Sequence, residues 1–473
     1  MRSYLLVPAL VAVLLASVLP AAAAAEIPAP TAEAVVSLID TGINPYHVEF
    51  RDDSALAQQH PSTYIEGYPA DVIALPLTLN APTYKDALAA DCALWESVER
   101  GKLYWIPGTK IIGAASFQNA NAVCDDGELT GEVHILDNGG HGTMTASRAA
   151  AKTYGACPTC RIVAIEYTGS VNLLGPAGSE DGPIEAISLA AANADWIDVQ
   201  SNSWGPIVPV YDPTGAGGLL GANPRFIREV ERVSAAQPAF WASGNGAAFR
   251  GGVLGHPTFL TPHATPSAIM VGGHDSGYMQ TWPGFPPHLV SDSCDSWAAH
   301  HDSIDSSANN VGGGTSGATP FVAGSAARII ADARSLLGDT STGQAAEGVL
   351  AQGDATGITE GPLADGSLTR EEWQRVLYTT ATARPAAQTE DGPPCGALGA
   401  PYNEVPVKWT DVPAGFPEFL NIGYGAVDGP AVELAGQVLR GSTPLPDRSA
   451  TDAYFEAHHT AGDVTHGIYT TPE

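Results

Sequence analysis

The chain has 473 residues, 44% of them hydrophobic, so it can bury one large core or two moderate ones. Its 51 acidic residues outnumber the 21 basic ones, and the resulting net charge of −30 would repel nucleic acid and anionic lipid. Glycine (52 residues) and proline (37 residues) are abundant but scattered among periodic segments, which favours a loop-rich globular protein over a disordered one.

The first 25 residues have the pattern of an export signal. Arg2 supplies the positive charge, residues 5–19 the apolar centre, and residues 21–25 the small side chains of a cleavage site. The alternative is an uncleaved anchor of a cell-envelope protein, because residues 4–25 are nearly long enough to span a bilayer. We expect a signal peptide at about residues 1–25, a secreted protein, and no stable membrane insertion after cleavage.

The chain contains six cysteines: Cys92, Cys124, Cys157, Cys160, Cys294 and Cys395. An even number in an exported chain predicts disulfides, although the spacing alone does not define their connectivity. The Cys157-Pro-Thr-Cys160 segment could be a redox motif or half of a zinc site. No second CxxC and no redox-type βαβ pattern accompany it, so a small local disulfide is favoured.

Short apolar strands alternate with helical segments along the chain. We expect strands at residues 34–39, 110–114, 161–167, 196–203 and 238–243, and helices at residues 144–151, 181–194, 223–236 and 321–333. This alternation predicts a three-layer α/β/α fold, in which a mostly parallel sheet is covered by helices on both faces. Ligands of such sheets bind at the carboxyl ends of the strands, where Asp40, Ser203 and Asn245 fall.

Two of four short motifs lie in the first third of the chain. Asp40 ends a strand and precedes Thr-Gly, which by itself indicates only a turn. An aspartic protease would need a second carboxylate of this kind, and the sequence has no second DTG or DSG. His141 lies between glycines at the expected start of a helix, where its ring is easily approached. An isolated histidine is more often structural than catalytic, so the role of His141 must be judged together with the other motifs.

The other two motifs follow later. Asn245, between two glycines at a strand end, is usually a turn residue, but its amide could donate to a developing oxyanion. Ser316, in the segment GGGTSGATP at residues 312–320, precedes an apolar helix whose N-terminal N–H groups and dipole favour a nearby oxyanion. We expect Pro320 in the first turn of this helix, where a missing N–H does no harm.

Together these residues are the parts of a nucleophilic acyl-transfer site. Ser316 supplies the hydroxyl, His141 the base, Asp40 the carboxylate that orients the base, and Asn245 an oxyanion donor. The order Asp, His, Ser is that of the subtilisin arrangement, whereas an α/β-hydrolase places its serine first, within GxSxG. Ser316 lacks that elbow because Ala318 stands at the last glycine position.

The chain resembles the subtilisin-like peptidases, or subtilases, in DTG at 40–42, HGT at 141–143, SGN at 243–245 and GTSGATP at 314–320. The resemblance implies a secreted, monomeric serine endopeptidase that hydrolyses polypeptides through an acyl-enzyme and needs no cofactor for its chemistry. A catalytically silent binding or scaffold protein of the same fold is the alternative, and the complete set of four residues argues against it.

The resemblance also assigns a substrate-binding region. One wall of this region is formed by Ser203, Trp204 and Gly205, and the other by Ala242, Ser243 and Gly244. Gly255 forms its base. A glycine at the base leaves room for a large apolar P1 side chain. Members of the family commonly bind structural calcium. Six aspartates could supply oxygen ligands for it: Asp125, Asp126, Asp292, Asp295, Asp302 and Asp305.

We expect a peptidase domain at residues 26–440 and a C-terminal extension at 441–473. The stretch between Asp40 and His141 is longer than compact family members need, so residues 51–107 are interpreted as an inserted subdomain that Cys92 and Cys124 could fasten. Because only residues 26–33 separate the expected signal from the first strand, we expect none of the inhibitory propeptides common in secreted members.

Two positions depart from the usual family pattern. Met144 stands where a histidine is usual, and Gly317 stands where a methionine follows the nucleophile. We expect both changes to alter packing and not chemistry. The later segments 369–380 and 423–425 resemble the last helix and the closing loop of the catalytic domain.

Overall fold

The central strands are runs of buried apolar and small residues whose side chains alternate between two faces. All six residues of β1 (Val35–Asp40) are buried. Val36 and Leu38 belong to one apolar cluster, and Val35 and Ile39 belong to another. Because successive residues of a strand point to opposite faces, the sheet is covered on both sides, as parallel sheets require.

The computed structural model describes residues 33–167, 181–205, 207–209, 224–244, 258–260, 267–275, 278–280, 287–292, 298–305, 309–310, 313–341, 343, 348–382, 407–408 and 423–458. The expected signal peptide, Asn245, Gly255, Cys294, Asp295 and Cys395 lie outside these residues.

Within the described chain, the main sheet has eleven strands in the order β19-β13-β12-β10-β8-β1-β7-β4-β3-β2, with β14 also paired to β12. The strands are β1 (Val35–Asp40), β2 (Ile73–Ala74), β3 (Tyr104–Trp105), β4 (Ile111–Ser116), β7 (Arg161–Glu166), β8 (Val199–Asn202), β10 (Ala239–Ala242), β12 (Ile269–Asp275), β13 (Tyr278–Gln280), β14 (Leu289–Asp292) and β19 (Val407–Lys408). From β4 through β7, β1, β8 and β10 to β12 every pair is parallel, which confirms the mostly parallel sheet.

Four small antiparallel pairs lie outside this sheet. They are β5 (Val123–Asp125) with β6 (Glu128–Thr130), β9 (Ile207–Pro209) with β11 (Thr258–Leu260), β15 (Ala298–Ala299) with β16 (Asn309–Asn310), and β17 (Val349–Gln352) with β18 (Ser367–Thr369). Three short 3₁₀ helices, Val48–Phe50, Leu56–Gln58 and Pro61–Thr63, follow β1.

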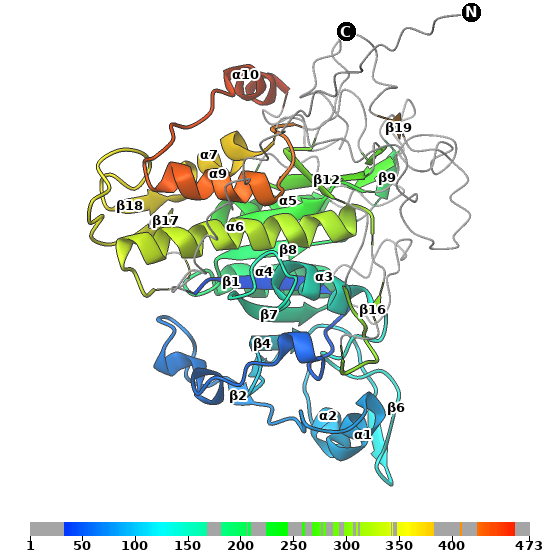
Figure 1. Ribbon diagram of the computed structural model, residues 1–473. Helices are drawn as coiled ribbons and strands as arrows, with labels where there is room; N and C mark the ends of the chain where they lie inside the picture. The colour runs from blue at the N-terminus through cyan, green and yellow to red at the C-terminus, as the bar shows by residue number, and fades with distance from the viewer. Residues whose placement is uncertain are drawn as a thin grey trace, which may run out of the picture.

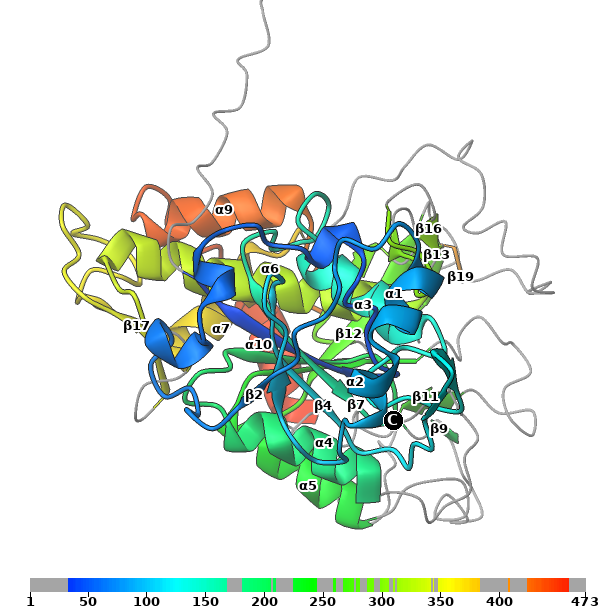
Figure 2. The ribbon, with the colours of Figure 1, turned by 90° about the horizontal axis from the view of Figure 1, so that it is seen from below.

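Helices cover both faces of the sheet (Figures 1 and 2). The described helices are α1 (Tyr84–Ala90), α2 (Cys92–Glu96), α3 (His141–Ala150), α4 (Asp181–Ala192), α5 (Pro224–Ala236), α6 (Thr315–Leu337), α7 (Arg370–Thr380), α9 (Gly429–Leu439) and α10 (Ser449–His458). Helices α3, α6, α7 and α9 pack on one face, and α4 and α5 pack on the other. None of the described helices is long and apolar enough to cross a membrane.

The insertion at residues 51–107 shares the cores of the main domain. Its strands β2 and β3 extend the sheet beyond β4, and Figure 1 shows its helices α1 and α2 below that edge. Trp95 belongs to the cluster under α3 and α6, whereas Tyr68 packs on Trp196 in the other cluster, with ring centroids 4.7 Å apart. The insertion is therefore built into the sheet edge, although the sequence suggested a subdomain on the surface.

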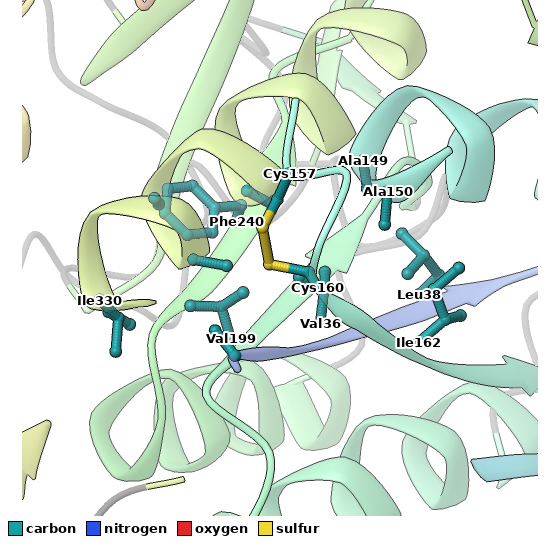
Figure 3. Close-up of a cluster of buried hydrophobic side chains, with 14 of the residues drawn as sticks. Val36, Leu38, Ala149, Ala150, Cys157, Cys160, Ile162, Val199, Phe240 and Ile330 are labelled. Carbon is teal, nitrogen blue, oxygen red and sulfur yellow. A yellow bond between two sulfur atoms is a disulfide. The ribbon is translucent and has the colours of Figure 1, made fainter. Parts of the chain in front are cut away.

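Both disulfides that the sequence suggested are present. Cys92–Cys124 joins α2 to β5, and Cys157–Cys160 closes the short loop before β7. Figure 3 shows the second disulfide among apolar side chains, with Val36 and Val199 beside it. It is fully buried, as expected for a structural bond and not for an exposed redox pair.

Candidate active site

The carboxyl ends of three neighbouring strands converge where the sequence motifs end. Asp40 is the last residue of β1, Ser203 follows β8 directly, and Ala242 is the last residue of β10. Strands β1, β8 and β10 are adjacent and parallel, so these ends lie on one edge of the sheet. This edge is the binding edge of open α/β sheets.

Asp40 and His141 are joined directly by a hydrogen bond. Nδ1 of His141 lies 2.7 Å from Oδ1 of Asp40, although the two residues are 101 positions apart in the chain. Asp40 also accepts hydrogen bonds from the backbone N–H of Thr41 (2.8 Å) and the hydroxyl of Thr145 (3.2 Å). Because an ionised carboxylate only accepts, Nδ1 of His141 must carry the proton, and this leaves the Nε2 lone pair free.

The same contact sets the basicity of His141. Burial would lower the pKa of the imidazole, but the negative charge of Asp40 and the hydrogen bond to it outweigh this effect. The pKa of His141 is therefore raised above its ordinary value of 6.5. A positioned imidazole can act as a general base and then as a general acid, because it takes a proton and returns it.

A second buried carboxylate, Asp137, holds the start of α3. It accepts hydrogen bonds from the backbone N–H groups of Gly140 (2.7 Å) and Thr143 (2.7 Å), and from the hydroxyl of Thr41 (2.8 Å). Thr41 in turn accepts from the N–H of Gly142 at 2.8 Å. The loop after β1 and the first turn of α3 are thus tied together on either side of the Asp40–His141 contact.

Ser316 is the second residue of α6 and lies beside Ser203. Its hydroxyl donates to the carbonyl oxygen of Ser203 (3.1 Å), and the hydroxyl of Ser203 donates to the carbonyl oxygen of Ser316 (3.0 Å). These two bonds fasten the N-terminus of the helix to the end of β8. The hydroxyl of Ser316 is thereby held at a positive helix end, where an anion is stabilised.

The expected position of Pro320 was wrong. Helix α6 begins at Thr315 and not near residue 321, so Pro320 lies inside the helix and beyond its first turn. The first turn forms before it because the N–H groups of Gly317 and Ala318 donate to the carbonyl of Gly314. Pro320 has no N–H to donate to the carbonyl four residues earlier, which is that of Ser316, and Ser203 supplies the missing donor instead.

The two expected walls of the substrate region follow β8 and β10. The N–H of Ser243 donates to Val271 (2.9 Å), and the N–H of Gly244 donates to the hydroxyl of Thr315 at 3.2 Å, beside Ser316. Ser203 and Gly205 flank Trp204, and Ala242 precedes Ser243. Both chain segments are thus placed near the N-terminus of α6.

Trp204 does not offer its ring to this region. The indole N–H donates to the carbonyl of Ile39 (2.7 Å), and the ring packs on Tyr167 and Trp241 with centroids 4.3 and 5.3 Å away. Only 6% of the residue is exposed. A contact of Trp204 with a ligand at this edge must therefore use its backbone.

Of the described acidic and histidine residues, one group gathers its donor atoms closely enough for a metal ion, namely His300, His301 and Asp302. Asp125, Asp126, Asp292 and Asp305 are described and join no such group.

Comparison with known proteins adds the deciding observation. The model of the subtilase family matches residues 31–392, which is more than half of the chain. The chain belongs to the subtilase family. It is a serine endopeptidase whose substrates are polypeptides, and subtilases need no cofactor for their chemistry.

Solved structures similar to this subtilase are distant in sequence. A cold-adapted subtilisin-like serine proteinase is 18% identical, with a TM-score of 0.36 over 64% of this chain and 77% of that chain. The epidermin leader peptide processing serine protease of Staphylococcus aureus is 15% identical, with a TM-score of 0.44 over 87% and 76%. The prenylagaramide maturation protease PagA is 14% identical, with a TM-score of 0.41 over 85% and 93%. No curated protein sequence gives a significant match.

Sequence reasoning missed two buried carboxylates of this subtilase. Asp137, four residues before His141, was not singled out, although its position just before a glycine-flanked helix start suggests a capping role. Glu166, at the end of β7, accepts from the N–H of Ile135 (2.6 Å), and burial raises the pKa of Glu166 well above its ordinary value. Ile135 has a φ of 74°, which is unfavourable for a β-branched residue, and Glu166 helps to hold it there.

Proposed function

We propose that this subtilase cleaves polypeptides through an acyl-enzyme on Ser316, with His141 as general base and Asp40 as its orienting carboxylate. The hydrogen bond between Asp40 and His141 carries the proposal, because it fixes the tautomer that a general base needs. The position of Ser316 at the N-terminus of α6 adds support, since an oxyanion formed there faces a positive helix end.

The proposed reaction begins with a change of hydrogen-bond partner. The hydroxyl of Ser316 donates to the Ser203 carbonyl in the free protein and must turn to Nε2 of His141. His141 then takes the hydroxyl proton as Oγ attacks the peptide carbonyl, and it returns this proton to the departing amine. In the second half, water takes the place of the Ser316 hydroxyl: His141 takes a proton from water as it attacks the acyl-enzyme, and returns the proton to Oγ of Ser316 as the carboxylic acid product leaves. Asp40 stabilises the imidazolium in both halves of the reaction.

Two further features complete the proposal. Asn245 directly follows Gly244 in the sequence, and the N–H of Gly244 donates to the hydroxyl of Thr315 at the start of α6, which supports a role of Asn245 at this site. We assign it the side-chain donor to the oxyanion, a contribution of about 3–4 kcal/mol to the barrier. Gly255 at the base of the substrate region gives a preference for large apolar P1 side chains.

The proposal includes export and, for the folded enzyme, bound calcium. The charge and apolar pattern of residues 1–25 support cleavage of a signal peptide, and the intact mass of the exported protein tests it. Bound calcium is tested by adding Ca²⁺ to dialysed protein, which should raise its melting temperature. Unchanged melting would remove calcium from the proposal.

A peptide library tests the activity and the specificity together. The exported protein should cut within the peptides, with large apolar residues enriched at P1. Ser316→Ala and His141→Ala should each abolish cleavage, while Ser54→Ala, which changes an exposed residue of the insertion, should leave it intact. Cleavage that persists in Ser316→Ala would overturn the assignment of the nucleophile, and a flat P1 profile would overturn the apolar preference.

A further inference from the structure

Three consecutive side chains gather metal-ligating atoms beside the loop that carries His141. One ring nitrogen each of His300 and His301 and one carboxylate oxygen of Asp302 lie within 4.8 Å of one another. The two imidazole rings are stacked, with centroids 4.9 Å apart and planes 23° apart. None of the three residues has a part in the proposed peptide hydrolysis.

The hydrogen bonding of these side chains is incomplete. Nδ1 of His300 accepts a long hydrogen bond from the N–H of Asp302 (3.4 Å), and the same nitrogen contacts Oδ1 of Asp302. Because a carboxylate oxygen only accepts, this contact needs a proton or a metal ion between the two atoms. Nδ1 of His301 is buried and has no hydrogen-bond partner among the residues that the structure describes. Among the described residues, no hydrogen bond at Nδ1 therefore fixes the tautomer of His301, and its ring can present a lone pair to an ion.

The backbone beneath the group is held firmly. The side-chain amide of Asn44 donates to the carbonyls of His300 (3.2 Å) and Ser303 (2.7 Å). The N–H of Val48 donates to the carbonyl of Ile304 at 2.9 Å. The side chain of Asp302 is 60% exposed and that of His300 is 30% exposed, so an ion can reach them from solvent. The segment is thus anchored at its backbone and open at its side chains.

We propose that His300, His301 and Asp302 bind one divalent cation of the zinc class, with a fourth position left for water. Two imidazoles and one carboxylate are a ligand set that Zn²⁺ favours, whereas Ca²⁺ prefers oxygen ligands throughout. With metal–ligand bonds of about 2.0–2.2 Å, two ligand atoms of a tetrahedral ion lie roughly 3–3.5 Å apart, so the spacing of the three donor atoms must adjust on binding. Side-chain rotation of the exposed Asp302 and the partly exposed His300 allows this.

The site is in contact with the loop before His141. Gly140 has a φ of 78°, and a Cβ at this residue would lie 2.8 Å from Nδ1 of His301. The ring of His301 therefore packs directly on the backbone of the residue that precedes His141. A metal held by His301 ties the segment of residues 300–302 to the N-terminus of α3 and stabilises both.

Metal binding to the full exported chain tests the proposal. The protein carries Ser316→Ala to prevent self-digestion and has no affinity tag, and it is freed of metal by dialysis. Competition between the protein and a chromophoric chelator for Zn²⁺ should give one ion bound per chain. Co²⁺ should bind in the same place and show the visible absorption of a four- or five-coordinate ion with nitrogen ligands. Zn²⁺ should also raise the melting temperature.

Matched variants separate this site from general surface binding. His300→Ala, His301→Ala and Asp302→Asn should each weaken Zn²⁺ binding by at least about tenfold and remove the thermal shift. His60→Ala and Asp125→Asn, which change a histidine and an acid elsewhere, should bind as the parent does. Circular dichroism checks that each variant is folded. If a histidine variant is misfolded, Asp302→Asn, which changes an exposed side chain, still tests the site. Parent protein that binds no Zn²⁺ at micromolar concentration, or ligand variants that bind like the parent, would overturn the proposal.

Discussion

At the scale of single residues, the site depends on how buried charges are satisfied. Asp40 is 4% exposed, yet it receives hydrogen bonds from His141, Thr41 and Thr145. A buried carboxylate with this many donors is held in one position and can orient a base. The raised pKa of His141 follows from the same contact, so the two residues act as one unit.

Replacing the carboxylate should change the pH dependence in a defined direction. In the wild-type protein, kcat/KM should fall as the pH falls through the pKa of His141, because the imidazolium cannot accept a proton. The midpoint should lie above 6.5. Asp40→Asn removes the charge that raises this pKa, so the midpoint should move down and kcat should drop by about 10⁴-fold.

The change in the pKa of His141 can also be measured in inactive protein. An NMR titration of His141 in the Ser316→Ala background, with and without Asp40→Asn, measures the pKa directly, and Asp125→Asn serves as a control for loss of a surface charge. An unchanged pKa of His141 in Asp40→Asn would contradict this account of the site.

Asp137 should act on the reaction as a positioning residue. Asp137→Asn keeps the shape but turns one acceptor oxygen into a donor, which breaks the bond to the N–H of Gly140 or Thr143 and shifts His141. We expect kcat to fall on the order of 100-fold with little change in KM, because misplacement of a catalytic group mainly affects the chemical step. Thr41→Ser, which keeps the bridging hydroxyl, should retain activity. Full kcat in Asp137→Asn would refute this role.

At the scale of elements, a buried ion pair fixes α6 relative to the sheet. Arg334 and Asp198 are both fully buried, and the guanidinium donates to both carboxylate oxygens at 3.0 and 2.6 Å. Arg334 also donates to the carbonyls of Leu350 (3.0 Å) and Gly343 (2.7 Å). The far end of the helix that begins beside Ser316 is therefore held at the start of β8.

Breaking this pair from one side should be costly. Arg334→Met leaves the carboxylate of Asp198 buried without its counter-charge, so the free energy of unfolding should fall by about 3–5 kcal/mol. The double variant Arg334→Met with Asp198→Asn removes the buried charge and should regain part of the loss. Urea denaturation measures both, and equal losses in the single and double variants would argue against the electrostatic cause.

The elements also show what one sequence can and cannot predict. The strands before Asp40 and Ser203 were predicted correctly from their apolar residues, because a run of apolar side chains is visible in a short stretch of sequence. The position of Pro320 could not be predicted, because a helix tolerates it only where Ser203, from a distant strand, supplies the missing donor. Asp137 was missed for the same reason, since one of its partners, Thr41, is 96 residues away in the chain.

At the scale of the whole molecule, two apolar layers separated by one sheet bring the motifs together. The insertion at residues 51–107 was recognised by its length, but its two-residue strands β2 and β3 give no periodic signal. Only the fold reveals that they extend the main sheet and that Trp95 enters the core under α3. Asn245 and Gly255, which lie outside the described residues, remain predictions.

The central claim is that Ser316 is activated in the folded protein by His141. Labelling with a fluorophosphonate, followed by peptide mapping, tests this most directly because the reagent modifies only a serine whose hydroxyl is activated. We predict one label per chain, on Ser316, in the folded wild-type protein, and none in Ser316→Ala, in His141→Ala or after denaturation. Folded wild-type protein that cleaves peptides while Ser316 stays unmodified would contradict the claim.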